Sequence, residues 1–384
     1  MSKKRIGILT GGGDVPPLNT VISAAIDKSK EKNVDLVGFL NGWQGLLDGN
    51  FINLTNINLN PHIGGTILRS SRVNLRKEPD ASSRIENVVK KNSIDGLIII
   101  GGEDTLSNSF LLKDFPQALI SKTIDNDVGI NNENNITNYF TLGYPTAAEK
   151  ISSFVSLNEG LRTTAYSHER IIVVESMGMH AGWLALSSSF GHTDFVVIPE
   201  FPLNYDLFLE KVIIKYREQK NLIIVLAEGS KWENGKHISA SEDEKDSFGH
   251  PKFKGAAEVL SKKLKEDLKK YFDSRNVNSV NPSYLYRSGK PNDLDVKAAE
   301  MLGREAINKL SGNLDKPVFL TLDYLNSELT TKDYKLSNLN DIEDFHRFVD
   351  SRYYDSSEFS ITNEGKNYLA KIIREFPKLE YGLK

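Results

Sequence analysis

Short apolar runs that end at glycine or acidic residues recur along much of the chain. The strongest cover residues 6–10, 94–100, 171–174 and 222–226, and weaker runs cover 34–40, 196–198 and 318–322. Apolar runs of this length are typical of strands that are buried on both faces, as they are in a parallel sheet. The sequence therefore predicts a set of buried strands.

Helical spacing of apolar residues follows several of these strands. It covers residues 18–26, 143–153, 256–272 and 294–310. Strands that alternate with helices from residue 6 to about 229 predict an α/β fold with mainly parallel sheets, in two lobes. Residues 129–138 and 231–254 are polar and predict surface loops, whereas the residues after about 322 carry no chemistry that the pattern identifies.

Composition narrows the class of protein. The 384 residues are 39% hydrophobic and 26% charged, which is ordinary for a globular protein, and the net charge of −3 does not favour nucleic-acid binding. The absence of cysteine excludes disulfides, thiolate catalysis and cysteine-based zinc sites. No apolar run reaches the length of a membrane span, and strand-like residues 6–9 leave no room for a signal peptide, so we expect a cytoplasmic protein.

The densest candidate chemistry is Lys-Thr-Ile-Asp-Asn-Asp at residues 122–127. If this segment is extended, Asp125 and Asp127 point to the same side, because strand side chains alternate with a period of two. Two carboxylates beside a lysine suit an Mg²⁺-assisted transfer in which one acid takes a proton. A polar loop that caps a strand is the alternative interpretation.

Three other turns carry groups suited to phosphate. Gly-Gly-Gly-Asp at 11–14 lies between a strand and a helix, an arrangement that directs backbone N–H groups at an anion. Residues 64–72 combine glycines, hydroxyls and Arg72, whose fork a phosphate accepts at two points. Gly-Gly-Glu-Asp-Thr at 101–105 supplies acids for Mg²⁺. Such turns converge at the carboxyl ends of parallel strands, although ligand-free turns would also give these patterns.

These turns, in this order, resemble the phosphofructokinase family over roughly residues 4–310. The resemblance rests on the turns above, on Met-Gly-x-His-Ala-Gly at 177–182 and on Tyr-Leu-Tyr-Arg at 284–287. It implies two similar Rossmann-like lobes with mainly parallel sheets and the active site in the cleft between them. Residues 1–138 would bind the phosphoryl donor, 139–255 would bind the sugar phosphate, 256–310 would return between the lobes, and 311–384 would form a C-terminal extension.

The family transfers a phosphoryl group to O1 of fructose 6-phosphate, in glycolysis and gluconeogenesis, so the resemblance implies roles for individual residues. Asp125 would be the general base, with Asp127 in support, and Arg72, Lys122 and Thr123 would complete the catalytic group. Mg²⁺ would be held by Glu103 or Asp104. The donor would be bound by Gly12, Gly13, Gly102, Asp104, Thr105 and Lys122. The sugar phosphate would be bound by Thr123, Asp125, Asp127, Met177, Gly178, Glu228, Tyr284 and Arg287. Arg170 would reach the site of a neighbouring subunit, which implies a homodimer or homotetramer. For Tyr284, buried packing is the alternative to contact with the sugar.

Two positions bear on the phosphoryl donor. Family members that use ATP generally have glycine in the place of Asp104, where a carboxylate would crowd and repel the α-phosphate. At an effective dielectric constant of about 20 and a separation of about 4 Å, like charges repel by about 4 kcal/mol. Lys122 resembles the lysine of pyrophosphate users. The sequence therefore predicts a reversible, pyrophosphate-dependent enzyme. An ATP-dependent kinase of the same family and a non-catalytic sugar-phosphate sensor remain the alternatives, whereas the glycine spacing does not fit a dehydrogenase.

Overall fold

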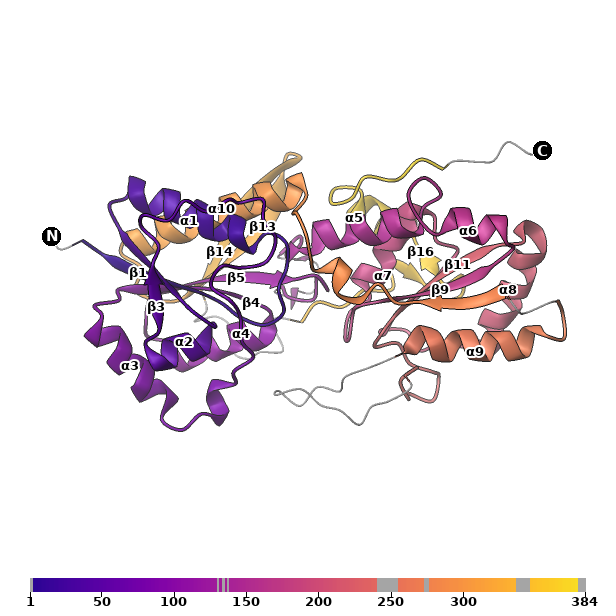
Figure 1. Cartoon of the computed structure of the whole chain (residues 1–384), viewed down its shortest axis with the longest axis horizontal. Coiled ribbons are helices and arrows are strands. Elements are labelled where there is room, and N and C mark those ends of the chain that lie inside the picture. The colour runs from indigo at the N-terminus through magenta and orange to yellow at the C-terminus, as the bar shows by residue number, and fades with distance from the viewer. Residues whose placement is uncertain are drawn as a thin grey trace. The chain divides into compact units, whose positions relative to one another are not determined.

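The computed structural model describes residues 3–129, 131–132, 135–136, 138–239, 255–272, 276–335 and 346–378. The chain divides into two compact units (Figure 1). Unit 1 comprises Met1–Ile124, Val128–Thr146 and Arg287–Arg347, and unit 2 comprises Asp125–Asp127, Ala147–Tyr286 and Phe348–Lys384. Each unit is therefore assembled from separate stretches of sequence.

Unit 1 is built on one mainly parallel sheet with the strand order β14-β13-β5-β4-β1-β2-β3, and β8 also pairs with β5. The strands are β1 (Arg5–Thr10), β2 (Asp35–Phe39), β3 (Phe51–Asn53), β4 (Gly96–Gly101), β5 (Gln117–Thr123), β8 (Leu142–Gly143), β13 (Val318–Leu325) and β14 (Glu328–Lys335). The β2–β3 and β13–β14 pairs, at the two edges, are antiparallel, and the other pairs are parallel. The predicted α/β class with mainly parallel strands is confirmed.

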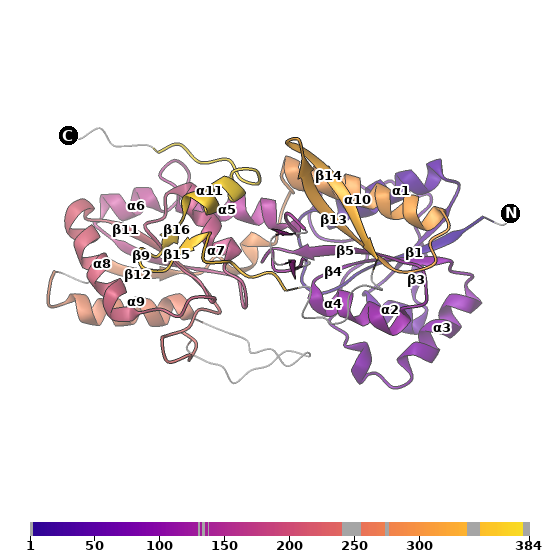
Figure 2. The same ribbon diagram turned by 180° about the vertical axis from the view of Figure 1, so that it is seen from behind.

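Helices cover both faces of this sheet (Figures 1 and 2). One face packs against α1 (Leu18–Glu31) and α10 (Asp293–Ser311), whose backbones approach so closely that a side chain on Gly303 would meet the carbonyl oxygen of Val21 at 2.5 Å. The other face forms a buried core with α2 (Trp43–Asp48), α3 (Ala81–Lys91) and α4 (Glu103–Ser107). Alternate residues of β4 serve the two faces, which explains why its apolar run is continuous.

Unit 2 contains a smaller, fully parallel sheet in the order β10-β11-β9-β12. Its strands are β9 (Ile171–Ser176), β10 (Phe195–Val197), β11 (Leu222–Ala227) and β12 (Val277–Val280). The surrounding helices are α6 (Arg162–Ser167), α7 (Trp183–Ser187), α8 (Tyr205–Gln219), α9 (Ala256–Leu268), α11 (Asn363–Leu369) and the greater part of α5 (Tyr144–Val155). Asn204 caps α8 and Thr362 caps α11, each accepting a hydrogen bond from a backbone N–H of the first turn.

The sequence pattern missed several elements. Strand β5 escaped prediction because Gln117, Ser121 and Lys122 interrupt its apolar character, although all three are buried in the structure. The stretch after residue 322 also contains structure: β14, the small pair β15 (Tyr354–Asp355) and β16 (Ser360–Ile361), and α11. The predicted helix at 256–272 ends at Leu268.

Two predicted surface loops fall partly outside the described residues. Residues 240–254 of the polar stretch 231–254 lie outside them, as do residues 130, 133, 134 and 137 of the asparagine-rich loop. Within that loop, β6 (Asn131–Asn132) and β7 (Asn135–Ile136) pair as two short antiparallel strands. None of the helices in the described part of the chain combines the length and apolar character needed to cross a bilayer.

Candidate active site

The glycine turn after β1 lies at the centre of the candidate donor site in unit 1. A Cβ on Gly11 would meet Thr105 Oγ1 at 2.5 Å, and a Cβ on Gly13 would meet Arg287 Nη1 at 2.4 Å. Gly12 has a φ of 76°, which side chains other than glycine rarely adopt. The turn therefore needs glycine for both space and backbone conformation.

Lys122 brings a buried ammonium group to this turn. It lies near the end of β5, its exposed fraction is 3%, and its Nζ donates a hydrogen bond to the carbonyl oxygen of Gly13. A Cβ on Gly12 would lie 3.5 Å from the same Nζ. Because the guanidinium of Arg287 lies against Gly13, two cations border one turn. The sequence resemblance assigned Arg287 to the sugar phosphate, and the structure brings it beside the candidate donor residues.

The loop at residues 64–72 is fastened over the same turn. Ser70 Oγ donates to the carbonyl oxygen of Gly12 at 2.5 Å, and the N–H of Gly12 donates to the carbonyl oxygen of Ser71 at 3.1 Å. Thr10 Oγ1 lies 3.1 Å from Thr66 Oγ1. Arg72 follows directly on the chain and is exposed. The structure thus holds the two residues that precede Arg72 beside Gly12.

The two candidate metal ligands open helix α4 at the end of β4. Glu103 and Asp104 occupy its first turn, and Gly102 precedes them. Thr105 is buried against Gly11 and Gly101, where a Cβ on Gly101 would meet Thr105 Cβ at 2.2 Å. Trp43 Nε1 donates to the Thr105 carbonyl oxygen at 3.0 Å. These contacts fix α4 beside the glycine turn.

The carboxylates of Glu103 and Asp104 fit one kind of metal site. Within the described residues there is no group of three or more His, Cys, Asp or Glu side chains that could hold a metal ion. Mg²⁺ commonly takes one or two protein carboxylates, waters and substrate phosphates. The pair therefore fits Mg²⁺ that arrives with a phosphorylated substrate, and it does not form a cage by itself.

The segment at 122–127 is not extended throughout. The condition under which strand alternation would point Asp125 and Asp127 to the same side is therefore not met. Strand β5 ends at Thr123, residues 124–125 form a turn, and Asn126 has a φ of 57°. Asparagine tolerates this left-handed conformation better than most residues. The directions of the two carboxylates are therefore set by a turn around Asn126 and not by strand alternation.

Three candidate sugar-phosphate residues of unit 2 come together at the carboxyl ends of β9 and β11. The N–H of Glu228 donates to the Ser176 carbonyl oxygen at 2.9 Å, and that of Gly229 donates to the Gly178 carbonyl oxygen at 3.1 Å. Gly178 has a φ of 128°. Met177, Gly178 and Glu228 therefore lie on two loops that are hydrogen-bonded to each other.

Tyr284 and Arg170 differ from this group. Tyr284 is 71% exposed, so the alternative of buried packing is wrong, and the buried tyrosine of this motif is Tyr286. Arg170 precedes β9 whereas Met177 follows it, so the length of the strand, about 20 Å, separates them. Arg170 Nη1 contacts Thr164 Oγ1 at 2.6 Å. The structure thus does not bring Arg170 to the Met177 loop of its own chain.

Two glutamates that the sequence did not identify, buried Glu175 and half-buried Glu200, brace these loops. Glu175 accepts hydrogen bonds from Ala257 N at 2.9 Å and Asn281 Nδ2 at 2.7 Å. Glu200 accepts from Gly182 N at 3.0 Å and Val349 N at 2.8 Å. Burial raises the pKa of both carboxyl groups. In the sequence each appeared only as an acid at the end of a strand, a pattern shared with many surface residues.

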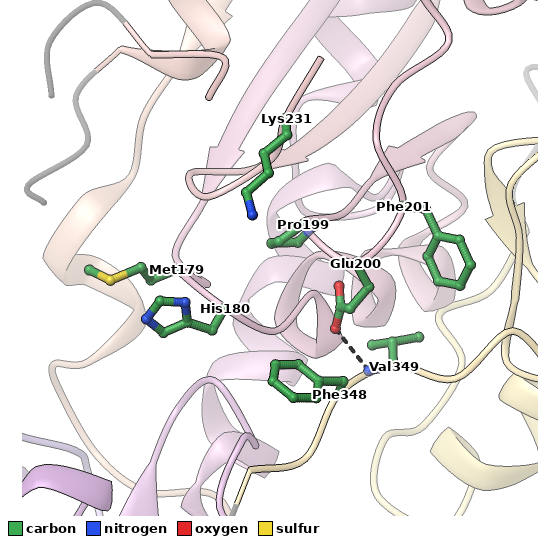
Figure 3. Close-up of a pocket in the computed structure, with 8 residues that line it drawn as sticks. All are labelled: Met179, His180, Pro199, Glu200, Phe201, Lys231, Phe348 and Val349. Carbon is green, nitrogen blue, oxygen red and sulfur yellow. Dashed lines mark hydrogen bonds between the residues drawn. The ribbon is translucent and has the colours of Figure 1, made fainter. Parts of the chain in front are cut away.

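Glu200 also borders a pocket of about 530 Å³ in unit 2 (Figure 3). Met179 and His180 of the 177–182 motif, Lys231 and Phe348 line it as well. Figure 3 shows the Glu200 carboxylate bonded to the Val349 N–H, which belongs to the chain beyond residue 310. The C-terminal residues therefore contribute directly to the surroundings of this motif.

Comparison with known proteins gives a consistent result. The family model described as phosphofructokinase matches residues 5–310. A pyrophosphate–fructose 6-phosphate 1-phosphotransferase of Dictyoglomus thermophilum is 37% identical over 315 residues, covering 80% of this chain and 86% of the relative. An ATP-dependent 6-phosphofructokinase 3 of Streptomyces coelicolor is 36% identical over 310 residues, covering 79% and 86%. The crystal structure of a pyrophosphate-dependent phosphofructokinase from Marinobacter aquaeolei shares the fold, with a TM-score of 0.78 at 20% identity, over 99% of this chain and 94% of the other.

Proposed function

Because the chain belongs to the phosphofructokinase family, we propose that it transfers a phosphoryl group from pyrophosphate to O1 of fructose 6-phosphate, yielding fructose 1,6-bisphosphate and phosphate. The observation that carries the donor assignment is the Asp104 carboxylate in the first turn of α4, which is fixed beside the glycine turn. A negative charge there opposes the additional phosphate of ATP, whereas pyrophosphate ends before that point. The name of the Dictyoglomus relative supports the same donor.

The proposed reaction is an in-line displacement at phosphorus. The 1-hydroxyl of the sugar gives its proton to Asp125 as its oxygen forms a bond to the terminal phosphorus of the donor. The bond between that phosphorus and the bridging oxygen breaks, and phosphate leaves. Asp127 supports Asp125, and Thr123 contacts the acceptor. Catalysis of this kind depends mainly on position and on neutralising the phosphate oxygens, which suits Lys122 and Arg72.

Glu103 and Asp104 are the residues that would hold Mg²⁺ in this reaction. When bound, the ion supplies neutralising charge for the donor phosphates. The backbone of Gly12, Gly13 and Gly102 and the side chain of Thr105 would complete the donor site. Because pyrophosphate and the phosphate monoester that is formed have comparable transfer potential, we expect the reaction to be reversible and to serve both glycolysis and gluconeogenesis.

The sugar phosphate would be bound by the Met177 and Glu228 loops, by exposed Tyr284 and by Arg287. Arg170 would serve the site of a neighbouring copy of the chain, because it lies at the opposite end of β9 from Met177. We therefore propose a homodimer or homotetramer.

The donor assay tests this function directly. Purified protein receives Mg²⁺, fructose 6-phosphate and either pyrophosphate or ATP, and fructose 1,6-bisphosphate is measured. We expect product with pyrophosphate and at least 100-fold less with ATP, since about 4 kcal/mol of repulsion would correspond to roughly 10³ in rate. The ATP-dependent Streptomyces relative, of nearly equal identity, makes an ATP-dependent kinase the second candidate, and product with ATP alone would favour it.

A further inference from the structure

The chain returns to the candidate donor site at His346, beyond the residues that match the family model. The backbone of His346 forms an antiparallel bridge with Val128, the residue after Asp127. The next residue, Arg347, is almost fully buried, and its guanidinium donates to the carbonyl oxygens of Asn138 and, at 3.1 Å, Tyr139. These contacts fix the backbone of His346 within unit 1.

The side chain of His346 meets the candidate metal ligand Glu103. Nε2 of the imidazole lies 3.3 Å from Oε2 of the carboxylate, and the two side chains are 25% and 28% exposed. The pair is made through Oε2, so it does not use the other carboxylate oxygen, Oε1. A neighbouring imidazole restricts the rotamers of a metal-binding carboxylate before the metal ion arrives.

The backbone around His346 is held in place by contacts other than those of its imidazole. Arg347 and the bridge to Val128 hold the backbone in unit 1, and in unit 2 the N–H of Val349 donates to half-buried Glu200 at 2.8 Å. A partly exposed contact between an imidazole and a carboxylate adds little to the stability of a fold that is secured in other ways. The position of the imidazole therefore points to a role at Glu103.

We propose that His346 is a positioning residue that orients the Glu103 carboxylate toward the metal–pyrophosphate complex. The C-terminal extension would thus complete a site whose other members all lie within residues 5–310. This inference rests on the proposed function, because it assigns Glu103 to a divalent cation bound with the phosphoryl donor.

Substitutions of His346 can test which ring nitrogen matters. Glutamine presents an amide N–H near the position of Nε2, whereas asparagine presents it near that of Nδ1. Binding of Mn²⁺ in the presence of imidodiphosphate, a pyrophosphate analogue that is not transferred, would be followed by electron paramagnetic resonance. Loss of a partner to a ligating carboxylate typically weakens metal affinity about 10–100-fold. We expect this loss in His346→Ala and His346→Asn, and an affinity within about threefold of the parent in His346→Gln.

The matched control is His192→Asn. His192 also approaches a carboxylate, with Nδ1 3.9 Å from Glu375 Oε1 in unit 2, and its φ of 65° is one that asparagine tolerates. We expect unchanged Mn²⁺ affinity in this variant. In steady-state kinetics, we expect His346→Ala to have a higher KM for pyrophosphate than the parent protein. Its KM for fructose 6-phosphate should change little.

The outcomes separate the two proposals. Parent-like Mn²⁺ affinity in His346→Ala, with or without lower thermal stability, would overturn the role of His346 even if the protein uses pyrophosphate. Equal loss in the Ala, Asn and Gln variants would overturn the assignment to Nε2. Conversely, weaker Mn²⁺ binding in His346→Ala alongside a parent protein that makes no product from pyrophosphate would retain the His346–Glu103 relationship and refute the pyrophosphate reaction.

Discussion

The side-chain amide of Asn126 donates a hydrogen bond to the hydroxyl of Tyr368 at 3.2 Å, so a residue of helix α11 holds the turn between Asp125 and Asp127. Asn126 is fully buried and Tyr368 packs against Trp183, with ring centroids 5.1 Å apart. The turn that carries the proposed catalytic carboxylates is therefore tied to an aromatic cluster of Tyr368 in α11 and Trp183 in α7.

This relationship predicts a difference between two substitutions of Asn126. Both Asn126→Gly and Asn126→Ala remove the amide, but only glycine adopts a φ of 57° without strain. We expect Asn126→Ala to lower the free energy of unfolding by about 1 kcal/mol more than Asn126→Gly does, and to lose more of kcat. Urea unfolding and steady-state kinetics would measure both. Equal effects in the two variants would contradict a role for the left-handed backbone.

Asp125→Asn tests the general base. The amide keeps the shape of the side chain and cannot accept the proton of the sugar hydroxyl, so kcat should fall by about 10²–10⁴ while the KM values change little. Initial rates at saturating pyrophosphate would measure this, with thermal unfolding as the control for folding. A variant as active as the parent would exclude Asp125 as the base.

Asp104→Gly tests the donor preference. Removing the carboxylate should raise kcat/KM for ATP relative to pyrophosphate by about 10-fold or more, because part of about 4 kcal/mol of repulsion is relieved. Asp104→Asn is the matched variant, since it removes charge and keeps volume. A gain in the glycine variant alone would assign the preference to crowding, and an unchanged donor ratio in both would refute the argument.

Arg170 tests the sharing of sites between subunits. Arg170→Ala should raise the KM for fructose 6-phosphate at least 10-fold, because a charge-assisted contact to phosphate is lost. Mixing Arg170→Ala protein with Asp125→Asn protein and allowing subunits to exchange should restore activity, since some sites then receive both intact residues. Size-exclusion chromatography would verify the mixed oligomer. No recovery in a verified mixture would place Arg170 outside a neighbouring site.

The raised pKa of Glu200 predicts that the stability of the fold depends on pH. Burial raises its pKa above the ordinary value of 4.5, so between these two values the folded state binds the proton that the unfolded state has released. Its contribution to stability is therefore greatest at low pH and is lost as the pH rises through the raised folded value. Glu200→Gln should lack this decline. Urea unfolding at several values between pH 4.5 and 8 would compare the slopes, and identical slopes would refute the prediction.

Sequence reasoning worked where one physical effect dominated. Continuous apolar runs identified β1, β4, β9 and β11 because both faces of these strands are buried. It missed β5, because the polar residues Ser121 and Lys122 break its apolar run although both are buried in the structure. The candidate turns beside the strands were found from glycines and charges, and their assigned roles remain proposals.

Other parts of the site depend on contacts between residues far apart in the sequence. Arg287 meets Gly13, and His346 meets Glu103, although no local pattern links either pair. The premise that Asp125 and Asp127 lie on an extended strand was wrong for a local reason, because β5 ends at Thr123 and Asn126 has a left-handed backbone. A single backbone angle of this kind has only a weak signature in the amino-acid sequence.

The order of segments in unit 1 has a consequence for synthesis on the ribosome. Strands β9 to β12 of unit 2 lie within residues 171–280, so their sheet can assemble while later residues are still being translated. In unit 1, by contrast, β5 pairs with β13, and α1 packs against α10, whose residues emerge only afterwards. Until then β5 presents an open edge and α1 an uncovered apolar face, both of which promote aggregation. We therefore expect the nascent chain to need protection by chaperones until about residue 335 has left the exit tunnel.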